Sequence, residues 1–272
     1  MPVGATGTSY TLSGPEGTPV VVLIHGLGLT CDSTFRQIAP ALARRFRVLS
    51  YDLCGHGQTR LPNRSPSLTV LSEQLITLMD ELAIAQAALV GFSLGGMINR
   101  RMAIDHPERV SALAILNSPH ERSAEQQKLI EERAHDTDAG GPAANLDVTL
   151  ARWFTSGYRS DHPDKVAQIR NIVLANDPEN YAAHRLVLAQ GVAELIWPDL
   201  PINLPTLVMT CENDSGSTPA MTRAIAAEIN GAKVHIVPSL QHLGLIEDPD
   251  TFATPIADFL GRTIGLIPKD RT

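Results

Sequence analysis

The stretch Ala87-Ala88-Leu89-Val90-Gly91-Phe92-Ser93-Leu94-Gly95-Gly96 decides the fold of this chain. Its first four residues are apolar and predict a buried strand, and the apolar spacing from Gly96 to His106 predicts a helix. The pattern Gly-x-Ser-x-Gly lies between them, and its two glycines, Gly91 and Gly95, let the strand and the helix approach each other across a sharp turn. Such a turn presents a hydroxyl at the N-terminus of a helix, whose dipole favours negative charge. The sequence therefore predicts that Ser93 is a nucleophile.

Predicted strands and helices alternate on either side of this turn. The strands are Val20–Ile24, Phe46–Tyr51, Ala87–Val90 and Val110–Leu116, and the helices are Ser33–Arg44, Leu68–Leu82 and Gly96–His106. Continuous apolar strands that alternate with amphipathic helices form parallel sheets covered on both faces. We therefore expect an α/β fold with a mostly parallel central sheet and helices on both faces.

The alternation stops in the middle of the chain. Between His120 and Leu200 the pattern predicts only helices, namely Ala124–Ala134, Leu146–Phe154, Lys165–Asn176 and Glu179–Leu195. Strands resume at Thr206–Thr210 and Val234–Val237, and a last helix is expected near Thr251–Leu260. A span of about 80 residues is too long for one connection between strands. We expect residues 120–200 to form a helical cap inserted into a core of residues 1–119 and 201–272.

The composition excludes several classes of protein. Among 272 residues, 43% are hydrophobic and the net charge is −7, without a basic cluster, so no nucleic-acid partner is expected. No stretch approaches the ~18 apolar residues that cross a bilayer, and the N-terminus lacks the features of a signal peptide. The three cysteines, Cys31, Cys54 and Cys211, have unrelated spacings. We expect a cytoplasmic protein with reduced thiols, a small-molecule substrate and no membrane partner; the sequence leaves open whether it is a homo-oligomer.

A serine hydroxyl needs a base to accept its proton, and the chain offers nine histidines. His242 lies in the loop between the predicted strand Val234–Val237 and the last helix. A Gly-x-Ser-x-Gly turn is followed along the chain first by the acid and then by the histidine, and His242 fits this order. The other histidines lie upstream, in or beside the predicted cap, or inside a strand. We expect His242 to be the base.

Two carboxylates compete to support this base. Glu212 and Asp214 both lie in the loop that follows the predicted strand Thr206–Thr210. Asp214 is favoured because it lies further into the loop, where its carboxylate can accept the second imidazole N–H and stabilise the imidazolium. The other place for an acid, after Val110–Leu116, holds Asn117 and no carboxylate.

Backbone amides are expected to stabilise the oxyanion. One donor is the N–H of Leu94, the residue after the nucleophile, and the other is the N–H of Leu27 in His25-Gly26-Leu27-Gly28. A second glycine-containing segment, from Tyr51 to Thr59, holds Asp, Cys and His side chains. No second ligand cluster accompanies it, so we interpret it as a tight turn rather than a metal site.

Together these motifs resemble those of the α/β-hydrolase superfamily. The resemblance extends over nearly the whole chain and comprises His-Gly-x-Gly at 25–28, Tyr-Asp-x-x-Gly-His-Gly at 51–57, Gly-x-Ser-x-Gly-Gly at 91–96, an Asp loop and a late His. Within the superfamily, the segments Arg152–Tyr158 and Arg170–Asn180 are similar to those of 3-oxoadipate enol-lactonases. Those lactonases often lack the His25-Gly26 pair, so the chain resembles the wider esterase group equally well.

The resemblance implies acyl transfer without a cofactor or metal. Ser93 attacks an ester or lactone carbonyl, the amides of Leu27 and Leu94 hold the oxyanion, and His242 protonates the leaving oxygen before water releases the acid. The same triad serves carbon–carbon bond hydrolases, amide or N-acyl hydrolases and cofactor-free perhydrolases. The fold also hosts non-catalytic proteins that bind small molecules.

A carboxylated lactone would need a cation in the cap. Arg133, His135 and Arg152 are the candidates, with Trp153 as a wall of the site. Each of these residues is also compatible with a solvated helix face.

Overall fold

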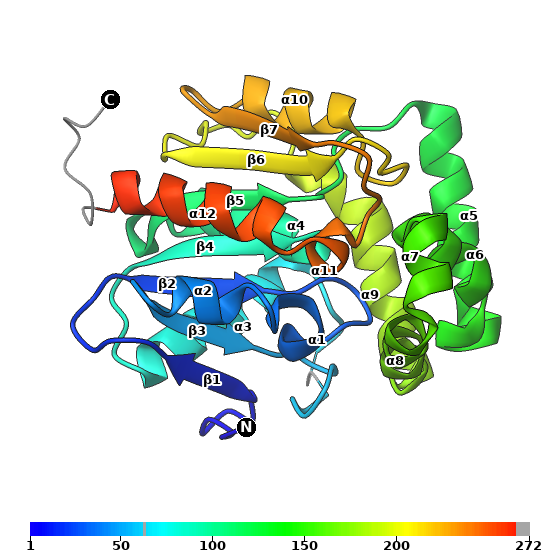
Figure 1. The fold of residues 1–272 in the computed structure, drawn as a ribbon, viewed down its shortest axis with the longest axis horizontal. Helices are drawn as coiled ribbons and strands as arrows, with labels where there is room; N and C mark the ends of the chain where they lie inside the picture. The colour runs from blue at the N-terminus through cyan, green and yellow to red at the C-terminus, as the bar shows by residue number, and fades with distance from the viewer. Residues whose placement is uncertain (62–63, 265–272) are drawn as a thin grey trace.

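The computed structural model describes residues 1–61 and 64–264 and contains one seven-stranded sheet within them (Figure 1). The strand order is β1-β3-β2-β4-β5-β6-β7, and every neighbouring pair is parallel except β1 with β3. The bounds are β1 Tyr10–Ser13, β2 Val20–Ile24, β3 Arg47–Tyr51, β4 Ala87–Phe92, β5 Val110–Leu116, β6 Thr206–Cys211 and β7 Lys233–Val237. The predicted mostly parallel sheet is confirmed, and β1 is an additional strand.

Helices cover both faces of this sheet, as predicted. Their bounds are α1 Cys31–Phe35, α2 Ala39–Leu42, α3 Leu68–Glu81, α4 Leu94–Asp105, α10 Pro219–Ala227, α11 Gly244–Glu247 and α12 Asp250–Thr263. In Figure 1, α2 and α12 lie in front of the sheet, whereas α3 and α4 lie behind it. The expectation of one helix at Ser33–Arg44 is wrong, because α1 and α2 are separate. Pro40 fits the first turn of α2, but inside a longer helix it would remove a hydrogen bond and clash.

Five α-helices and two short 3₁₀-helices, Gly141–Ala143 and Gly191–Glu194, connect β5 to β6. The α-helices are α5 Ala124–Gly140, α6 Leu146–Trp153, α7 Ser156–Asp161, α8 Pro163–Leu174 and α9 Pro178–Gln190. Figure 1 shows this group beyond the carboxyl ends of the strands, where the arrowheads point. The sequence did not predict α7, which begins after Thr155, whose hydroxyl accepts the Tyr158 N–H. The exact division into core and cap at residues 120 and 200 stays a prediction. Among the described residues, no helix is long and apolar enough to cross a membrane.

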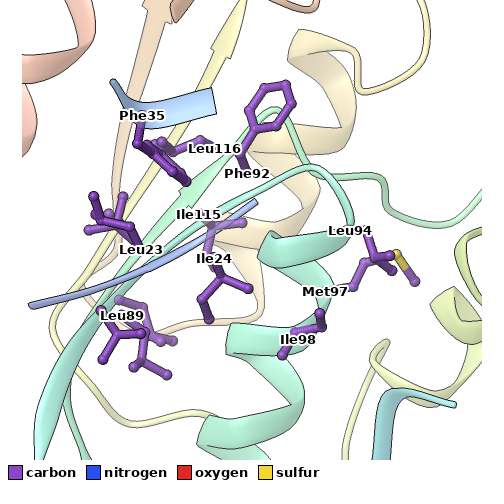
Figure 2. Close-up of a cluster of buried hydrophobic side chains, with 14 of the residues drawn as sticks. Leu23, Ile24, Phe35, Leu89, Phe92, Leu94, Met97, Ile98, Ile115 and Leu116 are labelled. Carbon is purple, nitrogen blue, oxygen red and sulfur yellow. The ribbon is translucent and has the colours of Figure 1, made fainter. Parts of the chain in front are cut away.

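The core of the sheet fixes the turn at Ser93. Figure 2 shows buried side chains of β2, β4, β5 and α4 packed together, among them Leu23, Ile24, Leu89, Ile115, Met97 and Ile98. The two neighbours of Ser93, Phe92 and Leu94, are themselves buried in this cluster. Full burial of such a side chain stabilises the fold by roughly 1.5–3 kcal/mol. The backbone on both sides of Ser93 is therefore held in place.

Candidate active site

Ser93 occupies a strained turn between β4 and α4. Its backbone angles are φ 55° and ψ −112°, in the region that favours glycine. A backbone of this kind costs roughly 1–3 kcal/mol and persists only where the surrounding structure enforces it. Gly91 and Gly95 make the turn possible, because a Cβ on Gly91 would collide with the Gly95 carbonyl and a Cβ on Gly95 with that of Ile24. The Ser93 N–H also donates to Leu116 O on β5 at 2.8 Å.

A cavity of about 110 Å³ opens at Ser93 and is covered by cap helices. An apolar protein cavity of ~150 Å³ accommodates benzene, so this space suits a small molecule. Its position at the carboxyl ends of parallel strands is typical of ligand sites in α/β sheets. The lining includes Gly26, Leu27, Phe92, Ser93, Arg122, Thr149, Arg152, Trp153, Tyr181, Arg185, Asp214, Ser215, Ser217 and His242.

The structure brings His242 and Asp214 together beside this cavity. His242 Nδ1 lies 2.6 Å from Asp214 Oδ2, although the two residues are 28 positions apart. The ring of His242 also packs against Phe92, with ring centroids 5.0 Å apart. Because Nδ1 faces the carboxylate, it carries the proton and leaves Nε2 as the basic nitrogen. Ser93, His242 and Asp214 thus lie around one cavity.

Asp214 is held as a carboxylate in spite of its burial. Its exposed fraction is 2%, and burial alone would raise its pKa, but the attraction of His242 and several hydrogen bonds outweigh this and lower the pKa. Oδ1 accepts the N–H groups of Gly216 and Ser217, both at 2.9 Å. Oδ2 accepts the side-chain amide of Asn117 at 2.9 Å in addition to His242. The negative charge is therefore available to stabilise an imidazolium.

Glu212, the competing acid, faces another way. Its Oε2 accepts the Ser239 N–H at 2.9 Å, in the turn that follows β7. The side chain is exposed and does not line the cavity. Its contacts indicate a role in holding this turn rather than a role beside His242.

Both predicted oxyanion donors lie near Ser93. Leu94 is the first residue of α4, so its N–H has no acceptor within the helix, and Leu27 lines the cavity. The loop of Leu27 is anchored by two buried histidines. His25 Nε2 accepts the Leu53 N–H at 2.9 Å, and His56 Nε2 accepts the Gly28 N–H at 3.1 Å. Burial lowers the pKa of both rings, which keeps them neutral acceptors.

The segment from Tyr51 to Thr59 forms a hydrogen-bonded turn. Asp52 Oδ1 accepts the Cys31 N–H at 2.9 Å, and His56 uses both ring nitrogens on backbone groups. Among the described residues, no three His, Cys, Asp or Glu side chains are arranged to hold a metal ion. All three cysteines are free, and burial raises the pKa of Cys54 to about 11 and of Cys211 to about 12. They are therefore protonated thiols near neutral pH.

The predicted cap residues divide into two pairs. Arg152 and Trp153, at the end of α6, line the cavity, and the Trp153 ring lies 6.2 Å from that of His242 between centroids. The Trp153 carbonyl accepts the Leu243 N–H at 2.8 Å, so this helix end is tied to the His242 loop. Arg133 and His135 lie on α5 with exposed side chains and do not line the cavity. The structure therefore does not bring this second pair to Ser93.

Several cavity residues were missed by the sequence analysis. They are Arg122, Tyr181 and Arg185 in the cap, and the analysis also missed Asn117, which does not line the cavity but donates to Asp214. The signal for Tyr181 and Arg185 is their i, i+4 spacing, which places both on one face of α9. The signal for Asn117 is its position at the end of β5, which the sequence analysis examined only for a carboxylate.

Positive charge dominates the cap side of the cavity. Burial lowers the pKa of Arg152, and the neighbouring cations Arg185 and Arg133 lower it further. Asp214 acts in the opposite direction. The guanidinium group of arginine is a cation in proteins. The cavity is suited to an anionic small molecule.

A serine in a strained strand-to-helix turn, beside a histidine–aspartate pair under a helical cover, defines a hydrolytic enzyme of α/β architecture. The chain belongs to the alpha/beta hydrolase fold family, whose model matches residues 19–249. It is 26% identical to 3-oxoadipate enol-lactonase 2 of Acinetobacter baylyi over 245 residues, 90% of this chain and 89% of that protein. It is also 26% identical to (E)-2-((N-methylformamido)methylene)succinate hydrolase of the same organism, covering 89% of this chain and 90% of that protein.

The solved structures include a similar enzyme. The enol-lactonase from Burkholderia xenovorans LB400 superimposes with a TM-score of 0.83 at 31% identity, covering 93% of this chain and 96% of that chain. These relatives are hydrolases of small molecules. The chain is accordingly an α/β hydrolase that acts on small-molecule substrates.

Proposed function

We propose that this enzyme is a serine hydrolase that cleaves an ester or lactone bond of a small carboxylated substrate, an enol-lactone such as 3-oxoadipate enol-lactone. The observation that carries the proposal is the 2.6 Å contact between His242 Nδ1 and Asp214 Oδ2 at the cavity that contains Ser93. A fixed imidazole with a free Nε2 is the group that a serine nucleophile requires.

In the proposed reaction, Ser93 Oγ attacks the carbonyl carbon while His242 Nε2 accepts the serine proton. The amides of Leu27 and Leu94 stabilise the oxyanion, and Asp214 stabilises the imidazolium. Collapse of the tetrahedral intermediate breaks the bond to the leaving oxygen, which takes the proton from His242. In a lactone, that oxygen stays attached to the acyl group. Water, deprotonated by His242, then attacks the acyl-enzyme, releases a carboxylic acid and restores Ser93.

The substrate class rests on the cap and on the relatives. Arg152 lines the cavity and provides a half-buried cation for a substrate carboxylate. The similarity to two enol-lactonases, one by sequence and one by structure, supports a lactone. A second candidate is an amide-type bond, favoured by the similarity to the succinate-derivative hydrolase. Both reactions use the same triad and oxyanion site.

The experiment compares a carboxylated enol-lactone with its neutral methyl ester on Arg152→Ala. A lost charge-assisted contact is worth about 1.5–3 kcal/mol, so kcat/KM for the acid should fall roughly 10- to 150-fold. The neutral ester should change by less than about threefold, because it makes no such contact. Arg159→Ala, at an exposed position of α7, controls for the loss of one positive charge in the cap. Equal losses on both substrates would contradict the role of Arg152.

A further inference from the structure

Two arginines line the cavity without a close ion pair in the described part of the chain, although the charge of Asp214 acts on Arg152. Arg152 comes from α6 and Arg185 from α9, and none of the carboxylates whose side chains the structure describes forms an ion pair with either. The third cavity arginine, Arg122, is different. Its guanidinium donates to Gln127 Oε1 at 3.1 Å and to Ala189 O at 3.3 Å, so it is engaged in holding the cap.

Arg185 is directed to the cavity by its helix. Tyr181, Arg185 and Leu188 follow one another at i, i+4 and i+7 on α9, and all three line the cavity. Arg185 Nε is buried without a hydrogen-bond partner within the described part of the chain. A buried donor without a partner costs roughly 1–3 kcal/mol, a cost that a bound acceptor would remove. Arg185 therefore has an unused donor at a ligand cavity.

The two arginines reach the cavity from different helices of the cap. Tyr181, which interacts with Arg185, packs on the oxyanion loop, since a Cβ on Gly28 would lie 2.7 Å from its ring. Arg152 precedes Trp153, whose ring lies beside His242. Arg185 is therefore linked through Tyr181 to the oxyanion loop, and Asp214, the partner of His242, acts electrostatically on Arg152. Repulsion from Arg185 helps to lower the pKa of Arg152, as expected for two cations that line one cavity.

We propose that the cavity binds a substrate with two carboxylates, one held by Arg152 and the other by Arg185. The proposal rests on the proposed function only in that the substrate occupies the Ser93 cavity. A single carboxylate would leave one of the two half-buried cations of the cavity without an ion-pair partner, whereas a dianion can pair with both. Arg185 is then a specificity-determining residue, and the inference narrows the proposed function to lactones or esters that carry two carboxylates beside the scissile bond, whereas 3-oxoadipate enol-lactone carries one.

The test measures the binding of unreactive probes by titration calorimetry at constant ionic strength. Adipate and hexanoate have the same number of carbons but carry two carboxylates and one. The wild-type enzyme should bind adipate at least about 10-fold more tightly than hexanoate. Arg185→Gln should weaken adipate binding about 10- to 100-fold and change hexanoate binding by less than about threefold, because Arg152 still holds a single carboxylate. Arg159→Gln is the matched control and should leave both affinities unchanged.

Two results would overturn the proposal. Equal affinity of the wild-type enzyme for adipate and hexanoate would show that no second carboxylate is held, whatever the behaviour of the variants. Equal losses for both probes in Arg185→Gln would show that the two arginines share one carboxylate. If Arg185→Gln does not fold, Arg185→Lys replaces it, and its loss should again be confined to adipate. Binding is measured without turnover, so these affinities would be the same even if the enzyme did not hydrolyse lactones. An enzyme that hydrolyses lactones but shows no preference for adipate would contradict this inference and leave the proposed function intact.

Discussion

The aspartate–histidine pair yields the most demanding prediction. Asp214→Asn keeps the shape of the side chain and its contact with Gly216 and Ser217, but it removes the negative charge opposite His242 Nδ1. Asparagine also offers an amide group in place of an acceptor, which favours the wrong tautomer of the imidazole. In a serine protease the same exchange lowers kcat by about 10⁴.

The structure supports an effect of this size here. Asp214 is 2% exposed, so water cannot replace its charge, and no other carboxylate among the described residues hydrogen-bonds to His242. We expect kcat to fall by about 10³ to 10⁴, equivalent to about 4–5.5 kcal/mol of transition-state stabilisation. The KM value should change little, since Asp214 acts through His242 rather than on the substrate.

The assay is steady-state hydrolysis of a short chromogenic ester, with Glu212→Gln as the matched control. Glu212 lies in the same loop, but its carboxylate accepts only the Ser239 N–H among the described contacts. We expect its exchange to change kcat by less than about threefold. A Glu212→Gln enzyme that is as impaired as Asp214→Asn, with both proteins folded, would refute the assignment of the acid.

Two further predictions concern stability. Folding lowers the pKa of Asp214, so its charge stabilises the native state above its unfolded pKa of about 3.9, and this contribution is lost as the pH falls through the folded value. In urea unfolding, the difference in free energy of unfolding between wild type and Asp214→Asn should be present at pH 7 and shrink below about pH 4. A difference that does not depend on pH would contradict the lowered pKa. Thr155→Val removes the 2.6 Å hydrogen bond to Glu247 and the N-terminal cap of α7, so the free energy of unfolding should fall by about 1–3 kcal/mol. The control Thr77→Val, at an exposed position, should lower it by less than about 0.5 kcal/mol. Equal effects of the two exchanges would contradict a stabilising contact between Thr155 and Glu247 of α11.

Most of the fold follows from local sequence patterns. The continuous apolar runs of β2 and β5 predict buried parallel strands, and their observed bounds coincide with those expected. β1 was missed because its four residues are alternately half-buried and exposed, and it is held by antiparallel pairing with β3. A short strand of this kind depends on a partner that is distant in the chain. The break between α1 and α2 was signalled by Pro40, but the apolar spacing around it favoured a single helix.

The candidate site was predictable where it depends on chain order and not where it depends on the orientation of helices. Ser93 and His242 are each adjacent to a strand end, and parallel strands bring their carboxyl ends to one edge. Arg185 and Arg133 both lie on helices of the cap, yet only Arg185 lines the cavity. The rotation of α5 and α9 about their axes is set by packing between helices, which a single sequence does not specify. The contact between Asn117 and Asp214 spans 97 positions and has no local signal.

The central claim is that Ser93 is the nucleophile, and covalent labelling tests it most directly. A fluorophosphonate transfers its phosphonyl group to an activated serine hydroxyl and releases fluoride. We expect peptide mass spectrometry to find one adduct per chain, on the peptide that contains Ser93, with hydrolysis lost in proportion to labelling. Ser93→Ala should abolish both the adduct and hydrolysis, and His242→Ala should slow labelling by at least about 100-fold. A folded Ser93→Ala protein that retains hydrolysis near the wild-type rate, or a stoichiometric adduct on another residue, would contradict the account.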